Sequence, residues 1–492
     1  VLGITMANEN IKPLTHSESV GVKLYLGISF AVVLLMMLAG LAMRASQSEW
    51  AVVSDTLFYQ LLTVHGAGMV GIAGFAGAAV MWFFLRRYVD LSVQILYANL
   101  VFFLVGVAAI LVSIFVGGYA GGWTFLWPLP ANSMGVWSAH AAAGFIVGLT
   151  LIGVGFLLFY LDAGLAITRR FGSILKGLGV DQLFGKVNPS HPATVVASSM
   201  VVIVNTLGIL VGAIVLVVTL VNLYVPSLSI NALLAKNMIY FFGHVFINAA
   251  IYMAVIAVYE LLPLYAKRPW KVSKAFYASW LAVTLFVLAV YPHHLLMDGV
   301  MPKSLLALGQ VVSYLSGIPV LLVTAYGALI LVYKSNIEWQ APARWLMLAL
   351  LGWSVGVVPA IVDGTIVVNR VMHNTLWVPG HFHLYLLAGF LPMIIGFALH
   401  VFAGERGLNE PFHRRVFNVY AVSALAFGAV FLASGAASIP RRWATHWEAW
   451  LGYDRVSTVM AAAVVLATTL IVLSVLRRLI TGGAPAVHAN ER

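Results

Sequence analysis

An all-α membrane protein of about twelve transmembrane helices is the fold class that the sequence predicts, and composition is the first reason. Of the 492 residues, 62% are hydrophobic and 9% are charged, and the mean hydropathy is +0.98. A soluble globule of this size needs far more polar surface than such a chain supplies. We therefore expect one integral membrane catalytic domain over residues 1–492, with cytoplasmic tails at both ends.

The second reason is a series of twelve apolar runs, each long enough for the roughly 20 residues that a helix needs to cross a bilayer. The first run is too long for a signal peptide and lacks a small-residue cleavage signal, so a retained helix is expected there. The longest connection, at 163–193, is predicted to be a cytoplasmic loop with an interfacial helix. The runs lie at about 22–43, 57–84, 95–119, 137–162, 194–224, 237–265, 273–294, 305–333, 344–367, 375–403, 415–437 and 455–477.

The third reason is the distribution of the 27 basic residues over the two sides of these runs. With a cytoplasmic N-terminus, the outer side receives only seven of them, and the rest fall on the cytoplasmic side. This asymmetry explains the net charge of +11 without a nucleic-acid partner. A multi-pass protein of a bacterial or archaeal cytoplasmic membrane, in contact with lipid, is expected. The seven outer residues are Arg44, Lys236, Lys303, Arg370, Arg441, Arg442 and Arg455.

The sequence contains no cysteine. A disulfide, a thiolate-ligated iron-sulfur cluster and a thiolate copper centre are therefore excluded within this chain. If the chain carries out redox chemistry, its electrons must arrive from another protein.

Six histidines inside or at the ends of the apolar runs carry most of the functional information. Imidazole is costly to place in hydrocarbon and is the commonest protein ligand for metals, so an ordered set of buried histidines indicates metal coordination. Lone histidines such as His140 and His400 are interpreted as hydrogen-bonded or interfacial residues. Four others fall in predicted loops or tails and are expected to be solvated. The six are His65, His244, His293, His294, His381 and His383, and the four are His16, His191, His413 and His488.

His381 and His383 stand two residues apart at the start of the tenth run. On a helix of 3.6 residues per turn such side chains point about 200° apart, so they leave opposite faces and can ligate two different hemes. Pro379 and Gly380 suit a tight helix start where a flat macrocycle approaches the backbone.

His244 lies near the outer start of the sixth run, and His293 and His294 lie at the outer end of the seventh. Consecutive helices joined by a short connection run antiparallel, so these ends come together. Three imidazoles can then converge on one copper, iron or zinc ion and leave coordination positions open for chemistry. His65, among small residues of the second run, lies at the same membrane depth.

This order of histidines on the second, sixth, seventh and tenth spans resembles the catalytic subunit of the heme-copper oxidoreductase superfamily, which includes oxygen reductases and nitric oxide reductases. The resemblance covers nearly the whole chain. The segments HNTLWVPGHFHL and GGWTFLWPLP, with the 49-residue interval from His244 to His293, are most similar to B-type oxygen reductases.

The resemblance implies that His65 and His383 ligate a low-spin heme and that His381 is the proximal ligand of a high-spin heme. It implies one copper or non-heme iron held by His244, His293 and His294. His373, Arg441 and Arg442 match positions that contact heme propionates or nearby water, and arginine forks suit carboxylates. An exposed basic pair is the alternative interpretation of the two arginines.

One departure from the resemblance bears on the reaction. Most oxygen reductases of this superfamily place a redox-active tyrosine four residues after the first metal-ligating histidine, where this chain has Asn248. Another branch takes the tyrosine from a position that here is Val287. The best-known nitric oxide reductases use a glutamate in place of Asn248, so the second metal stays open. A helix–helix hydrogen bond is the alternative role for Asn248, and Tyr252 and Tyr291 are candidate substitutes for the tyrosine.

Proton supply is the second point of comparison. B-type oxygen reductases carry protons along the sixth and eighth spans, where Tyr259 and Thr324 match but Val320 replaces an expected serine. Glu260 is an intramembrane acid and thus a functional candidate. A snorkelling interfacial carboxylate is the alternative.

The leading hypothesis is a nitric oxide reductase that forms nitrous oxide and water from two nitric oxide molecules, two electrons and two protons. Without a redox tyrosine, a two-electron reaction fits the site better than four-electron dioxygen cleavage. The alternative is a B-type dioxygen reductase that pumps protons. A histidine-lined transporter would show repeats that the sequence lacks. We expect a second subunit with a soluble copper or heme c domain, supplied by cytochrome c or a cupredoxin, with quinol as another possible donor.

Overall fold

The computed structural model describes residues 13–188, 190–402 and 408–481. Both predicted cytoplasmic tails and His488 lie largely or wholly outside these residues. Within them the chain is helical, and twelve helical stretches are long and apolar enough to cross a membrane. The predicted fold class and the twelve spans are confirmed.

The first six spans are long single helices. Three of them begin with a serine cap: the side chains of Ser54, Ser92 and Ser138 each accept a hydrogen bond from a backbone N–H of the first turn. The helices are α1 (His16–Gln47), α2 (Asp55–Leu85), α3 (Val93–Phe115), α4 (Ala139–Phe171), α7 (Ala193–Tyr224) and α8 (Ala232–Ala266).

The seventh, eighth and tenth spans are interrupted. Pro292 and Pro319 stand at two of the breaks, where proline removes a backbone donor and obstructs the preceding turn. The seventh span is α9 (Lys274–Ala289) followed by the 3₁₀ turn η1 (Tyr291–Leu295). The eighth is α10 (Lys303–Ser316), α11 (Ile318–Val320), the π-helical segment η2 (Leu321–Ala325) and α12 (Tyr326–Val332). The tenth is α15 (Trp377–His383), the π-helical segment η3 (Leu384–Phe390) and α16 (Leu391–Phe402).

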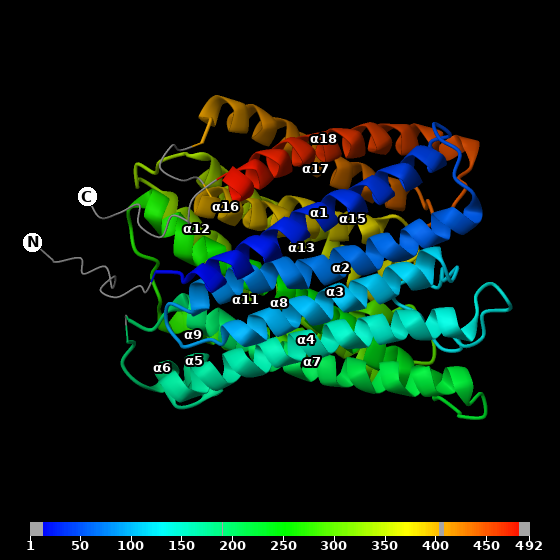
Figure 1. The fold of residues 1–492 in the computed structure, drawn as a ribbon, viewed down its shortest axis with the longest axis horizontal. Coiled ribbons are helices and arrows are strands. Elements are labelled where there is room, and N and C mark those ends of the chain that lie inside the picture. Colours follow the sequence, from blue (N-terminus) through cyan, green and yellow to red (C-terminus); the bar gives the residue numbers. More distant parts are fainter. Residues whose placement is uncertain (1–12, 189, 403–407, 482–492) are drawn as a thin grey trace, which may run out of the picture.

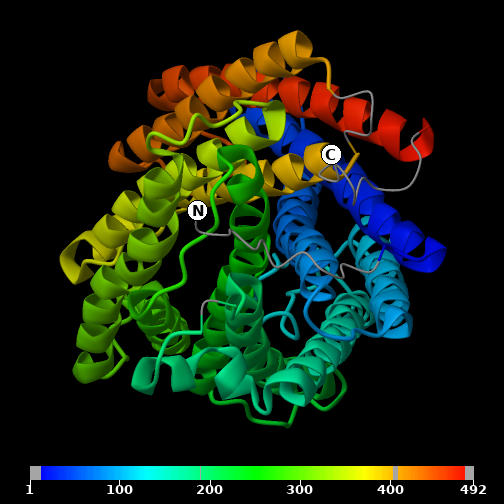
Figure 2. The same ribbon diagram turned by 90° about the vertical axis from the view of Figure 1, so that its left-hand side faces the viewer.

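The remaining spans are α13 (Ala341–Asp363), α17 (Glu410–Ala436) and α18 (Leu451–Thr481), with the short helix α14 (Ile366–Met372) before the tenth span and the 3₁₀ turn η4 (Glu448–Trp450) before α18. Figure 1 shows the long helices running side by side, with the start of α1 and the end of α18 at the same end of the bundle. In the end view of Figure 2 the chain passes around the bundle until α18 returns to lie against α1.

Burial divides the spans into two groups. The most hydrophobic windows of α2, α8 and the tenth span are 83%, 89% and 83% buried, whereas that of α3 is 33% buried. Helices hydrophobic on all sides and buried form the centre of a membrane bundle, and the others present apolar faces to lipid. The three central spans carry four of the six histidines.

Three expectations about connections and histidines are wrong. The connection at 163–193 begins with an extension of α4 and holds two short helices, α5 (Ile174–Gly177) and α6 (Val180–Phe184), in place of one. His191 and His413 are buried rather than solvated. His191 bonds to the carbonyl of Gly177, and His413, in the first turn of α17, lies within reach of Ser474 on α18. Packing of a loop against the helices buries the first, and packing of α17 against α18 buries the second, and hydropathy registers neither.

Candidate functional site

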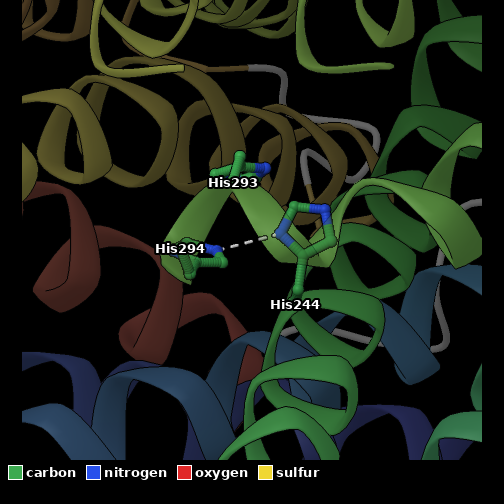
Figure 3. Close-up of side chains that lie close together, drawn as sticks. All are labelled: His244, His293 and His294. Carbon is green, nitrogen blue, oxygen red and sulfur yellow. Dashed lines mark hydrogen bonds between the residues drawn. The ribbon is translucent and has the colours of Figure 1, made fainter. Parts of the chain in front are cut away.

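Three histidines converge beside the N-terminal half of α8, as the antiparallel arrangement of the sixth and seventh spans predicts. His244 projects from α8 toward His293 and His294 on η1, and Nδ1 of His244 lies 3.1 Å from Nε2 of His294 (Figure 3). One nitrogen from each ring lies within 4.8 Å of the others. Three imidazoles at this separation can close around a single metal ion with bonds of ~2.0 Å.

The turn that carries His293 and His294 is fixed by neighbouring polar groups. The Tyr291 hydroxyl donates to Oδ1 of Asn237 on α8 at 3.2 Å, and Lys236 forms an ion pair with Asp298. Nδ1 of His293 bonds to the carbonyl of Val290 at 2.8 Å. The first two contacts tie η1 and the residues after it to α8, and the third fixes the His293 ring within its own turn.

His65 on α2 and His383 at the end of α15 face one another. Their ring centroids are 6.3 Å apart with an interplanar angle of 24°. This gap matches one metal ion bound by both imidazoles, since two metal–nitrogen bonds of ~2.0 Å must fit between the rings. Phe427 and Phe431 pack against His383, with ring centroids 5.1 and 5.2 Å from that of the imidazole.

The second ring nitrogen of each of these histidines is bonded to the backbone. Nδ1 of His65 bonds to the carbonyl of Met36 at 2.7 Å, and Nδ1 of His383 to that of Pro379 at 2.6 Å. Nδ1 of His381 bonds to the carbonyl of Gly356 at 3.2 Å. Metal-ligating histidines typically donate their other N–H in this way, which fixes the tautomer and leaves Nε2 for the metal.

His381 and His383 have different neighbours, as their spacing predicts. His383 faces His65, whereas the ring of His381 packs edge-on against Tyr385 at 4.8 Å. A Cβ at Gly380 would lie 2.9 Å from the backbone nitrogen of Leu432, so this glycine allows the close approach of α17. Its predicted contact with a macrocycle stays a prediction.

One predominantly apolar cavity connects the two groups of histidines. His65 and His383 lie in its wall, and so do His244 and His294. A flat apolar ligand with metal-binding capacity fits such a space, because most of its surface would be buried against hydrocarbon and only its metal and polar edge need protein ligands.

Several polar residues lie in or beside the wall of this cavity. Nδ1 of His373 bonds to Oδ2 of Asp363 at 3.2 Å, and the His373 ring lies 6.1 Å from that of His294. Arg441 and Arg442 line the cavity, and burial together with the adjacent Arg442 lowers the pKa of Arg441 to about 10. Arg442 adopts a left-handed backbone with φ of 68°, a conformation that clusters at ligand clamps. An anionic ligand edge would complement these two guanidiniums.

Asn248 lies one turn after His244 and contacts it. Its Nδ2 lies 3.1 Å from Nε2 of His244 and donates to the His244 carbonyl at 2.9 Å. Tyr252, one turn further, packs against Trp280 and Trp353. The Tyr291 hydroxyl is bonded to Asn237 instead of a metal-site histidine. Of these three predicted candidates, Asn248 is the one that bonds to a histidine of the cluster.

Glu260 lies near the C-terminal end of α8, and its carboxylate has three bonded partners. Its carboxylate pairs with Arg87 at 3.2 Å and accepts hydrogen bonds from Tyr88 and Thr194. Its side chain is only 10% exposed, which does not match a snorkelling carboxylate. One residue before it, Tyr259 bonds to Thr324 of η2 at 2.5 Å. The predicted pairing of the sixth and eighth spans is thus present, with buried Val320 beside it.

Sequence reasoning missed two features of the site. Tyr240, one turn before His244, stacks on His294 with ring centroids 5.6 Å apart and an interplanar angle of 21°. Asp363 supplies a buried carboxylate next to His373, and its Oδ1 has no hydrogen-bond partner. Tyr240 could have been found from its spacing of four residues to His244, whereas the contact of Asp363 depends on the fold of α14.

A family comparison agrees with this arrangement. Residues 21–467 match the model of the family described as Cytochrome C and Quinol oxidase polypeptide I. The chain belongs to this family. As an oxidase polypeptide I family member it is a heme-copper membrane oxidoreductase subunit, and membership implies hemes and a histidine-ligated metal site.

Curated relatives within this family are distant. A heme-copper oxidase subunit I+III of Aeropyrum pernix is 23% identical over 52% of this chain and 31% of its own length. The quinol oxidase subunit 1 of Bacillus subtilis is 24% identical over 73% of this chain and 55% of its own length. The cytochrome c oxidase subunit 1 of a Synechocystis species is 24% identical over 79% of this chain and 71% of its own length. The alignments thus span a third to about half of the first two relatives.

The chain shares its fold with a solved structure. That structure is described as a heme-copper terminal oxidase dimer, and the similarity covers 96% of this chain and 88% of that chain, with a TM-score of 0.78 and 17% identity. At this identity the likeness concerns the fold alone.

Proposed function

We propose that the chain is the catalytic subunit of a nitric oxide reductase, converting two nitric oxide molecules, two electrons and two protons to nitrous oxide and water. The observation that carries the proposal is the amide of Asn248 against His244, in place of a phenol. Fold and family are shared by several reactions, so the reaction must be argued from the site.

In this proposal two hemes and one further metal bind the six histidines. His65 and His383 would hold the low-spin heme, because their rings face each other with Nδ1 atoms committed to backbone carbonyls. His381 would hold the high-spin heme, and His244, His293 and His294 the copper or non-heme iron. A heme iron with an adjacent metal supplies two electrons and positive charge for coupling two nitrogen atoms.

Asn248 has a defined part in the proposal. Its Nδ2 donates to the carbonyl and contacts the ring of His244, so it fixes the imidazole while its Oδ1 can accept a hydrogen bond. An amide gives up neither an electron nor a proton. The chemistry at this site is therefore limited to what the metals and two delivered electrons provide.

Two further groups of polar residues would support the same reaction, one by binding the hemes and one by delivering protons. Arg441 and Arg442 would bind heme propionates and hold the ring edges, with His373 alongside. Tyr259 and Thr324 form the first hydroxyl pair of a proton route from the cytoplasmic side. Glu260, held by Arg87 and Tyr88, would collect protons near its entrance.

Electrons would come from a partner. The chain has no cysteine for a copper centre or for thioether attachment of heme. We therefore include a second subunit with a copper or heme c domain on the outer side, reduced by cytochrome c or a cupredoxin, with quinol as an alternative source. The N-terminus would be cytoplasmic, as the charge asymmetry favours.

Dioxygen reduction is the second candidate, and the comparisons favour it more directly. The three relatives described above are named as heme-copper, quinol and cytochrome c oxidases, and none is named a nitric oxide reductase. Tyr240 also places a phenol against His294. Its ring is stacked, so it does not present an edge for the covalent tyrosine–histidine bond of the resemblance.

Metal and product analysis of the purified complex tests the proposal. Two hemes and one copper or non-heme iron per chain are expected, together with labelled nitrous oxide from ¹⁵N-labelled nitric oxide at two electrons per product molecule. Absence of nitrous oxide from a fully metallated enzyme would overturn the nitric oxide assignment. One heme or none per chain would overturn the ligand assignments.

A further inference from the structure

The last two spans carry an exposed strip of side chains that none of the roles above uses. Helices α17 and α18 pack against each other, and Nε2 of His413 on α17 lies 3.4 Å from Oγ of Ser474 on α18. The first turn of α17 therefore lies beside the last turns of α18, and the two helices run antiparallel. The most hydrophobic windows of these two spans are only 39% and 44% buried, and both helices lie at the surface of the bundle in Figure 2.

Each of the two helices has an exposed apolar stripe with an arginine at one end. On α17, the exposed residues Arg415, Val419 and Val422 are spaced by four and three positions, so they share one face. On α18, four exposed residues with the same kind of spacing share a face. These are Leu466, Leu470, Leu473 and Arg477. Counted from the His413–Ser474 contact at about 100° per residue, Arg415, Val419 and the α18 stripe fall on the same side of the helix pair.

The acid in the first turn of α17 already has partners. The Glu410 carboxylate pairs with Arg344 at 2.8 Å and accepts a hydrogen bond from the backbone N–H of Ala341 at 3.0 Å. Arg415 and Arg477 are both exposed, on neighbouring helices at the same end of the bundle. Guanidinium forks suit phosphate, because two parallel N–H groups meet two phosphate oxygens. A phosphate group therefore complements this end of the strip.

The length of the strip corresponds to one leaflet of a bilayer. Leu466 and Arg477 are eleven positions apart, which is ~16 Å along a helix that rises 1.5 Å per residue. Half of the ~30 Å hydrocarbon core is about 15 Å. The two arginines can thus lie at the level of the lipid head groups while the apolar side chains lie at the level of the acyl chains. The charge asymmetry predicts that this leaflet is the cytoplasmic one.

We propose that Arg415 and Arg477 bind the phosphate of an anionic phospholipid, whose acyl chains lie along the exposed stripes of α17 and α18. The head group carries no amine, because an ammonium group would compete with the arginines for the phosphate. Such a lipid joins the ends of the last two spans. Because α18 in turn packs against α1, a bound lipid stabilises the closed bundle. The inference is independent of the metals and of the gas that is reduced.

Titration of the delipidated complex with defined lipids tests the proposal, with the melting temperature and the lipid retained in mass spectra as readouts. Phosphatidylglycerol should raise the melting temperature saturably, and phosphatidylcholine at the same concentration should not. In R415Q/R477Q the affinity for phosphatidylglycerol should fall about tenfold or more, because both cations are lost. R414Q is the matched control: Arg414 is also exposed on α17 but points to the other side of the helix pair, so the affinity should stay near that of the parent.

Three results would overturn the proposal: equal stabilisation by the two lipids, unchanged affinity in R415Q/R477Q, or an equal loss of affinity in R414Q, which would indicate non-specific attraction. If the double variant does not fold, R415Q alone decides in the same way, with a severalfold loss expected. Leu473→Cys separates a lipid from a protein as the occupant, since the chain has no other cysteine. A photoreactive label on the introduced thiol should form adducts with lipid, and adducts with a protein subunit instead would rule out the lipid.

Discussion

At the residue scale, the hydrogen bonds made by the histidine ring nitrogens are the most informative feature of the site. Three histidines bond through Nδ1 to the carbonyls of Met36, Pro379 and Gly356, which leaves Nε2 of each available. His65 and His383 line the apolar cavity, and a histidine that only filled space would not need to keep one ring nitrogen available there. The pattern of bonds, more than burial, supports a ligand role for these imidazoles.

Substitution of Asn248 tests its contact with His244. Asn248→Ala removes both hydrogen bonds and should lower nitric oxide turnover about tenfold, because a buried bond of this kind contributes ~1–3 kcal/mol when its partner is left unpaired. Turnover and non-heme metal content should be measured together. Asn205→Ala in α7, where the amide bonds to Tyr160, is the matched control and should leave the metal in place. Unchanged turnover in the Asn248 variant would contradict a role for this amide.

Phenylalanine variants decide whether Tyr291 and Tyr252 are redox substitutes. Tyr291 donates to Asn237, so Tyr291→Phe should lower turnover only severalfold, in line with the ~0.5–1.5 kcal/mol of an ordinary hydrogen bond. Tyr252→Phe, which keeps the packing on Trp280, should behave similarly. Loss of several orders of magnitude in either variant, with metals retained, would reveal an obligatory phenol and favour dioxygen chemistry.

Some of the site followed from sequence and some did not. The grouping of histidines at one membrane depth predicted which imidazoles meet, because helix order and antiparallel packing fix it. The contacts of Tyr240 with His294 and of Asp363 with His373 could not be predicted, because they depend on the direction of the side chains. The ion pair between Arg44 of α1 and Asp454 of α18 joins residues 410 positions apart, and no local sequence pattern predicts such a contact.

At the element scale, interruptions of the helices position the candidate metal ligands. The seventh span ends in a 3₁₀ turn that carries His293 and His294, and a π-helical segment directly follows His383. Such irregular segments are frequent at functional sites because they re-aim side chains. Hydropathy predicted the twelve spans, since a bilayer demands long apolar runs, but it contains no information on these local changes of helical pitch or on the short helices before α7.

The close approach of α1 to α2 gives a test at this scale. A Cβ at Gly40 would lie 2.9 Å from Cε1 of His65, so Gly40→Val should displace the imidazole. We expect loss of the low-spin heme spectrum with the metal of the other three histidines retained. Gly27→Val on the same helix, where a Cβ has no atom within 4 Å, is the control and should keep both hemes. A normal spectrum in the Gly40 variant would contradict ligation by His65.

At the scale of the whole molecule, two groups of polar residues lie at opposite ends of the bundle. The histidine cluster and Arg441 and Arg442 lie toward one end of the bundle, which the charge asymmetry predicts to be the outer one, whereas Glu260, Arg87 and the Tyr259–Thr324 pair lie toward the other end. Electrons entering from outside and protons from inside would then meet at the histidine cluster. This arrangement suits either candidate gas, which is why the reaction depends on the few residues around His244.

Comparison of the two gases under equal electron supply tests the central claim most directly. Steady turnover of the purified, fully metallated complex should be measured with nitric oxide and with dioxygen, using the same donor at the same concentration. The proposal predicts sustained formation of nitrous oxide at a rate well above that of dioxygen consumption. Fast, sustained reduction of dioxygen to water with weak nitric oxide consumption would contradict it and identify the protein as a terminal oxidase.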